Sequence, residues 1–323
     1  MHFGSLLRTR WIALLVMLSS SFFRFANAGD FPDHPIQLIV PFAAGGGLDA
    51  NARAFSQALT ETTGTSVVVV NKDGANGTIG LQFLAMSKPD GYTIAFAPAV
   101  SLTSEPYRSK AVRYGVDSFT PVCQVFDNIF AIVVPSDSPY KSVSDLIQDA
   151  RARPGAVSYG TAGIGSIPHM GAADIEAAEK IQLNHIPYRG DGPMLRDLLS
   201  GRIDFGAMLT SSVASQVQAG KLKLLAVFSE RRHPGFPDVP TLKDAGIPVA
   251  QPSFGGVLLP AAAPANVLKL LESACQKATH SASYLNWANQ VGQLVEFGSS
   301  KEFDMRLRED SRIKQATIKR LGL

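Results

Sequence analysis

The chain has 323 residues, a formal net charge of only +3 and 46% hydrophobic residues, enough to build sizeable cores. It shows no basic stripe with interleaved aromatic residues, so we expect no nucleic-acid partner. Its two cysteines, Cys123 and Cys275, are too few for a disulfide framework or a zinc site. They could pair in an oxidising compartment, but we expect two buried thiols.

The first 28 residues have the pattern of a secretory signal peptide. Arg8 and Arg10 make a basic start, an apolar run follows from Trp11 to Leu18, and Ala26-Asn27-Ala28 is a small-residue cleavage site. The apolar run is too short to span a bilayer comfortably. We therefore expect cleavage after Ala28 and export of residues 29–323, a length that favours two domains.

Residues 36–62 predict a strand over 36–40, a glycine turn and a helix. The apolar run Ile36–Phe42 ends in Ala43-Ala44-Gly45-Gly46-Gly47, and Asp49 is the expected cap of a helix over 49–62. Glycines let the backbone take unusual dihedral angles and let a ligand approach the N–H groups. Because bare N–H groups at a helix start attract anions, this turn predicts half of an anion site.

Strands and helices alternate through the rest of the chain. Strands are predicted at 66–70, 93–97, 129–134, 157–159, 185–187, 205–207 and 222–227, and helices at 77–86, 142–153, 168–178, 192–200, 211–219, 264–277 and 300–321. This alternation predicts two α/β domains, each a mostly parallel sheet flanked by helices. We expect residues 29–128 and 251–323 to form domain 1, with residues 129–250 inserted as domain 2. The two C-terminal helices should pack on domain 1.

A second glycine loop follows the strand at 157–159. It consists of Thr161, Ala162, Gly163, Ile164, Gly165 and Ser166, and His169 lies in the first turn of the next helix. The Ser166 hydroxyl could cap that helix or bond to a ligand. His169 could donate to a carboxylate, or it could only hold the loop. Both glycine loops lie beyond carboxyl ends of strands, where ligands bind in such sheets.

The familiar catalytic, cofactor and metal motifs are missing. Neither glycine loop continues as Gly-Lys-Ser/Thr, neither fits the dinucleotide spacing, and no G-x-S-x-G elbow or H-E-x-x-H helix occurs. The histidines lack ligand-like spacing. We expect no metal, no cofactor and no catalysis. An exported α/β enzyme using Ser166 and His169 is the alternative hypothesis.

Asp204 precedes the strand at 205–207 and leaves two interpretations open. It could tether backbone N–H groups near the cleft, or it could recognise a donor on a ligand. We include it among the candidate ligand-binding residues.

Seven segments together resemble one known family. They are PIQLIVPFAAGGGLDANAR, VVVVNKDGANGTIG, KPDGYTI, SYGTAGIGSIPHM, HIPYRGDGPML, GRIDFGAM and PDVPTLKDAG, and they cover nearly all of residues 29–323 in the right order. They resemble the Bug family, the extracytoplasmic receptors of tripartite tricarboxylate transporters. Lys72-Asp73 in place of Arg-Pro, and Asp191 in place of Gly, depart from the family pattern on turns.

The resemblance implies a two-domain, Venus-flytrap solute-binding protein in the bacterial periplasm. Its ligand would be a small carboxylate such as a di- or tricarboxylate, an acidic amino acid or an aromatic acid. Its partners would be the membrane subunits of the transporter, and we expect a monomer. A receptor that signals to a sensor, without transport, stays open as an alternative.

The resemblance also implies how the ligand is held. One carboxylate would lie between the two glycine loops, partly through ordered water, without a lysine or arginine. The candidate ligand-binding residues are Phe42, Ala44, Gly45, Gly46, Asp49, Thr78, Ser101, Thr161, Ala162, Gly163, Gly165, Ser166, His169 and Asp204. Phe42, Phe126, Phe130 and Phe254 offer apolar surface for an aromatic acid, although we favour core packing for them.

Overall fold

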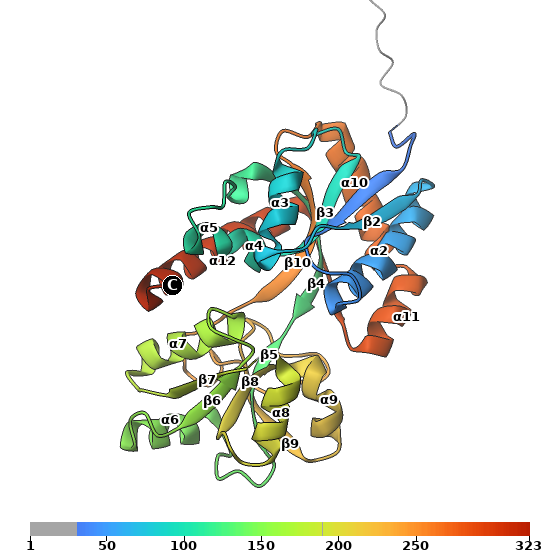
Figure 1. Ribbon diagram of the computed structural model, residues 1–323. Helices are drawn as coiled ribbons and strands as arrows, with labels where there is room; N and C mark the ends of the chain where they lie inside the picture. The colour runs from blue at the N-terminus through green and yellow to red at the C-terminus, as the bar shows by residue number, and fades with distance from the viewer. Residues whose placement is uncertain (1–30, 189) are drawn as a thin grey trace, which may run out of the picture. The chain divides into compact units, whose positions relative to one another are not determined.

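The structure is a computed structural model that describes residues 31–188 and 190–323 (Figure 1). The description below concerns residues 34–323, which form one compact unit. The predicted signal peptide, residues 1–28, lies outside the described residues, and so does Arg189. No helix in the described ranges is long and apolar enough to cross a membrane.

The first sheet has the strand order β11-β4-β10-β3-β1-β2. Strand β1 is parallel to β2 and β3, whereas β10 runs antiparallel to β3 and β4, and β11 antiparallel to β4. The strands are β1 (Ile36–Val40), β2 (Val67–Asn71), β3 (Thr93–Pro98), β4 (Phe119–Asn128), β10 (Ser253–Pro260) and β11 (Leu294–Gly298).

The second sheet has the strand order β7-β6-β8-β5-β9. Strand β6 is parallel to β7 and β8, whereas β5 runs antiparallel to β8 and β9. The strands are β5 (Phe130–Pro135), β6 (Ser158–Thr161), β7 (Asn184–Pro187), β8 (Phe205–Leu209) and β9 (Leu222–Val227). Strands of the first sheet precede Ile129 or follow Pro252, and those of the second lie between; the exact domain boundaries stay a prediction.

Both sheets are mixed, so the prediction of mostly parallel sheets was wrong while the two-domain α/β fold is confirmed. Strand β4 ends at Asn128 and β5 begins at Phe130, so the chain passes from one sheet to the other without a crossover helix. The antiparallel pairs of the first sheet all involve β4, β10 or β11, which were absent from the prediction, and those of the second sheet all involve β5.

Helices cover both sheets (Figure 1). As predicted, α10 packs on α2 and β4, and α12 packs on β4 and α4. The helices are α2 (Gly47–Thr63), α3 (Thr78–Ala85), α4 (Val100–Thr103), α5 (Glu105–Arg108), α6 (Val143–Ala152), α7 (Ile167–Glu179), α8 (Asp191–Leu199), α9 (Thr210–Gln218), α10 (Ala265–Thr279), α11 (Ala282–Val291) and α12 (Ser300–Leu321), with short 3-10 turns at Ala75–Gly77 and Val116–Ser118.

Strand β5 shows why the apolar runs became buried strands. Ile132 and Val134 belong to one hydrophobic cluster, and Ala131 and Val133 belong to another on the opposite face. Successive side chains of a strand point to opposite faces, so a strand covered on both faces needs an unbroken apolar run.

Cys123 and Cys275 form a disulfide that joins β4 to α10, with their Cα atoms 6.5 Å apart. The expectation of two separate thiols was wrong. The residues are 152 positions apart in the chain, and only the packing of α10 against β4 brings them within bonding range.

Candidate ligand-binding site

The first glycine turn leads into α2, whose N-cap is Gly46 rather than Asp49. Asp49 lies in the first helical turn and is only 3% exposed. Its carboxylate accepts hydrogen bonds from the Gly45 N–H (2.9 Å), Arg53 Nε (2.9 Å) and Asn71 Nδ2 (2.8 Å). The prediction that Asp49 is the N-cap was therefore wrong. Its buried carboxylate instead holds the glycine turn in place through these hydrogen bonds.

The Asp49 carboxylate is ionised at neutral pH. The hydrogen bond from Arg53 and those from Gly45 and Asn71 outweigh burial and lower its pKa to about 2. A negative charge held this way fixes the turn and leaves the outer face of the loop free. Ala44, Gly45 and Gly46 are exposed on that face.

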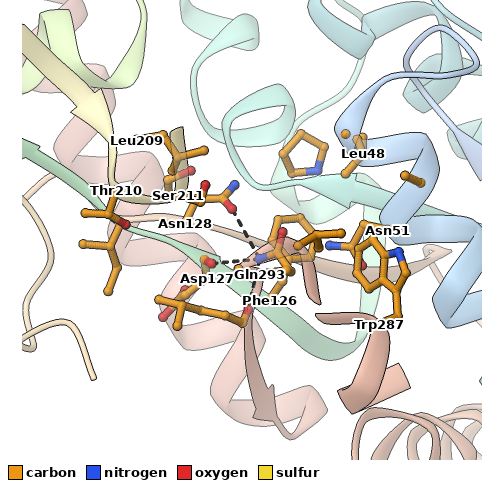
Figure 2. Close-up of a pocket in the computed structure, with 18 of the residues that line it drawn as sticks. Leu48, Asn51, Phe126, Asp127, Asn128, Leu209, Thr210, Ser211, Trp287 and Gln293 are labelled. Carbon is orange, nitrogen blue, oxygen red and sulfur yellow. Dashed lines mark hydrogen bonds between the residues drawn. The ribbon is translucent and has the colours of Figure 1, made fainter. Parts of the chain in front are cut away.

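The start of α2 opens on a cavity of about 510 Å³ (Figure 2). Gly47 and Leu48 line the cavity, and the N–H groups of a first helical turn have no carbonyl partner within the helix. The remaining lining residues come from both sheets and their helices: Phe42, Ala50, Asn51, Pro98, Val100, Phe126, Asp127, Asn128, Ile129, Leu209, Thr210, Ser211, Ser253, Trp287, Val291, Gly292, Gln293 and Leu294.

One end of the cavity wall is held by hydrogen bonds from the side-chain amide of Gln293 (Figure 2). Gln293 Nε2 donates to the Asp127 carbonyl (3.0 Å), to the Leu294 carbonyl (3.1 Å) and to Asn128 Oδ1 (3.4 Å). These bonds tie the turn before β11 to the point where the chain passes from β4 to β5. The cavity therefore lies at the connection between the two sheets.

The second glycine loop has the cap that the sequence predicts. Ser166 is the N-cap of α7, and its hydroxyl accepts from the His169 N–H (3.4 Å) and donates to the Gly163 carbonyl (2.7 Å). The Gly165 N–H donates to His169 Nδ1 (3.0 Å), and Thr161 Oγ1 bonds to His185 Nε2 (2.7 Å).

None of the residues of the second glycine loop is among those that line the cavity, although Ala162 is exposed. The structure therefore does not bring the two predicted halves together around this cavity.

His169 and His185 are neutral at pH 7. Burial lowers the pKa of both imidazoles, that of His185 to about 4. The charge of Arg108 lowers the pKa of His169 further, and His169, whose ring is stacked 4.2 Å from that of His185, lowers the pKa of His185. Because Nδ1 of neutral His169 accepts the Gly165 N–H, its proton is on Nε2. His169 thus presents a neutral N–H donor.

Ser166 and His169 do not form a nucleophile–base pair. The Ser166 hydroxyl donates to a backbone carbonyl, and His169 Nδ1 accepts from a backbone N–H. A base that activates serine must instead accept the hydroxyl proton. The geometry gives no support to the enzyme hypothesis at these two residues.

Arg108 lies beside the second glycine loop, and the sequence analysis did not name it. It lies on α5 near the first sheet, yet a Cβ added at Gly165 would meet its Nη2 at 2.7 Å. Arg108 Nη1 donates to Glu105 (3.0 Å), which also accepts from Asn76 Nδ2 (3.3 Å). An arginine therefore lies next to a glycine loop, and no motif in the sequence distinguished this residue.

Phe42 and Ser101 meet around Gly77. A Cβ added at Gly77 would contact Ser101 Oγ at 2.8 Å and the Phe42 ring at 3.1 Å. These close contacts explain why a residue without a side chain occupies this position. Ser101 is buried and donates to the Asn76 carbonyl (2.8 Å), and Thr78 begins α3 beside this contact. Of the predicted ligand-binding residues, Phe42 alone is among those that line the cavity.

Asp204 lies at the other end of the second sheet from its glycine loop. Its carboxylate accepts from the Ser158 N–H and hydroxyl, both at 2.7 Å, at the amino end of β6. The glycine loop follows the carboxyl end of that strand. Tethering of a backbone N–H is the role that the structure shows.

Asp191 does more than occupy a turn. It accepts hydrogen bonds from the Leu209 N–H and the Ser212 side chain, and burial raises its pKa. It therefore fixes the start of α9, whose residues Thr210 and Ser211 line the cavity. In the described part of the chain, no group of three His, Cys, Asp or Glu side chains is placed to hold a metal ion.

Comparison with known families decides which class of protein this is. Residues 51–323 match the model of the tripartite tricarboxylate transporter family receptor. The chain belongs to this receptor family. The family is one of periplasmic solute-binding proteins, and the two mixed sheets have its flytrap-like fold.

Individual relatives agree with this family. The protein BugT of Bordetella pertussis is 34% identical over 263 residues, which cover 79% of each chain. A TctC solute-binding protein from Polaromonas is 30% identical, with a TM-score of 0.85 over 90% of this chain and 99% of that one. A protein of R. palustris, solved with adipate, is 28% identical, with a TM-score of 0.71 over 91% and 99% of the two chains.

Proposed function

We propose that this receptor captures a small carboxylate in the periplasm and delivers it to the membrane subunits of a tripartite tricarboxylate transporter. The observation that carries the proposal is the 510 Å³ cavity at the start of α2, between elements of both sheets. A helix start supplies N–H donors and a favourable dipole for an anion. The family membership and the adipate in the R. palustris relative support a carboxylate as that anion.

The first glycine turn would supply one side of the site, through Phe42, Ala44, Gly45 and Gly46. The second loop would supply the other when the two domains close on the ligand. Its donors would be the N–H group of Ala162, which is exposed, and the neutral Nε2–H of His169, with Arg108 beside Gly165. Thr78 and Ser101 would line the approach.

This proposal includes export and a monomeric receptor. The signal-peptide pattern supports cleavage after Ala28, and the Cys123–Cys275 disulfide fits an oxidising compartment. The detection of the cleaved chain in a periplasmic extract, and one disulfide in its intact mass, would support export, and the mass of the folded protein in solution would test the monomer.

Binding is tested with residues 29–323 by calorimetry and thermal melting against monocarboxylates, dicarboxylates, tricarboxylates and aromatic acids. A ligand at about 100 times its Kd stabilises the folded state by about 2.7 kcal/mol, which raises Tm by roughly 5 °C. The uncharged amides of the same acids are the matched control and should leave Tm unchanged. No heat and no Tm change across the whole panel would refute the proposal.

A further inference from the structure

We propose that the ligand is a monocarboxylate with an aromatic body, held in the 510 Å³ cavity with its carboxylate at the start of α2. This inference rests on the proposed function and names the ligand class. Three features of the cavity carry it: its apolar walls, an amide donor of Asn51 that faces it, and the lack of any cationic side chain in its lining.

The cavity walls suit a flat apolar body. Phe42, Phe126 and Trp287 supply aromatic rings, and Val291 at 52% exposure marks an open side. Aliphatic side chains complete the wall: Val100, Ile129, Leu209 and Leu294. A volume of about 510 Å³ lies within the range of about 300–1,000 Å³ typical of small-molecule sites. Aromatic walls favour a ring that stacks on them.

Asn51 is an independent sign of a ligand at the polar end. The residue is 2% exposed, and its Oδ1 accepts from the Tyr284 hydroxyl at 2.6 Å. Among the described residues, its Nδ2 makes no hydrogen bond, and Figure 2 shows the side chain among those that line the cavity. In the part of the chain that the structure describes, Nδ2 is not one of the fully buried polar atoms that lack a partner, so it is accessible from the cavity and can donate to a ligand oxygen.

The position of Asn51 on α2 places this donor near the helix start. Asn51 follows Gly47 by one turn, so the two residues share a face of the helix. Helical side chains lean toward the N-terminus, so the Asn51 amide covers the first turn. The N–H groups of Gly47 and Leu48 and the Asn51 amide therefore converge on one anion.

The rest of the cavity does not favour a second carboxylate. Its lining residues include no lysine, arginine or histidine. Asp127 is their one ionisable residue, and it is paired with Arg306 at 2.7 Å. The start of α9 is already bonded to the Asp191 carboxylate. A second ligand carboxylate would lose its water without gaining a partner.

Trp287 makes the site directly observable. The sequence has two tryptophans, and the other, Trp11, lies in the predicted signal peptide. Residues 29–323 therefore carry one tryptophan, in the cavity wall. We expect benzoate and phenylacetate to change its emission in proportion to the binding heat, and benzamide to change neither.

Asn51→Asp is the decisive variant. It retains an acceptor for Tyr284 while it replaces the amide donor with a negative charge, so we expect benzoate to bind at least about 30-fold more weakly. Asn184→Asp, at an exposed position of β7, is the matched control and should bind normally.

Val291→Glu, with Leu270→Glu on α10 as its control, tests the wall without a buried substitution. Both positions are about half exposed, at 52% and 50%. We expect only Val291→Glu to lower the affinity for benzoate, by about 10-fold.

The outcomes separate this inference from the proposed function. Binding of adipate or succinate, with no binding of aromatic monocarboxylates, would overturn the inference and leave the proposed function standing. Binding of aromatic acids that Asn51→Asp and Val291→Glu leave unchanged would overturn the location. No binding of any carboxylate would overturn both.

Discussion

Asp49→Asn tests the claim that an ionised side chain braces the first glycine turn. The carboxylate accepts from Gly45, Arg53 and Asn71, and its pKa lies near 2 instead of 3.8. That difference corresponds to about 2 kcal/mol at neutral pH. The Arg53 side chain is 53% exposed, so water weakens its contribution and we expect 1–2 kcal/mol, roughly.

The stabilisation has a defined pH window. Because the folded-state pKa is lowered, the contribution is complete above pH 4, roughly the unfolded pKa, and is lost as pH falls toward 2. Urea unfolding of the parent and the variant from pH 7 to pH 2.5 measures it. We expect the difference in unfolding free energy to shrink as the pH falls. A difference that is independent of pH, or a variant as stable as the parent at pH 7, would refute the reasoning.

Three other changes test separate parts of the structure. Gly165→Val places a side chain at φ 75° and against Arg108, so urea unfolding should show a loss of about 2 kcal/mol that Arg108→Ala only partly restores. Cys275→Ser opens a link between residues 152 apart, so the melting curve should show a loss of about 2–4 kcal/mol, and dithiothreitol should then have no further effect; equal melting of parent and variant would contradict the disulfide. His185→Gln should flatten the fall in stability between pH 6.5 and pH 4, since burial lowers the folded-state pKa of His185 to about 4 and the unfolded state takes up the proton first; an unchanged pH profile would count against this.

Local patterns predicted the elements around both glycine loops. The strand Ile36–Val40 and the helix Ser300–Leu321 appear with the expected bounds, and Ser166 caps its helix. Apolar runs and caps act over a few neighbouring residues, so a sequence displays them directly. Asp49 shows the limit, since its cap position was wrong while its bracing role depends on Asn71, 22 residues away.

The aromatic residues show the same division. The sequence analysis named Phe42, Phe126, Phe130 and Phe254 and favoured core packing for them. Phe126 and Phe254 are indeed 1% exposed, but Phe42 is half-buried, and it lines the cavity together with Phe126. Trp287, which shares that wall, attracted no attention because helix α11 was not predicted.

By itself, the sequence determined the α/β class, the family and the two glycine loops, because these depend on short-range patterns and on motifs in order along the chain. Only the tertiary structure decided the mixed sheets, the disulfide, the place of Arg108 and the cavity at Asn51. Each depends on residues far apart in the chain: Asn51 bonds to Tyr284 across 233 positions, and Cys123 to Cys275 across 152. Such contacts follow from how whole elements pack, and no local pattern encodes them.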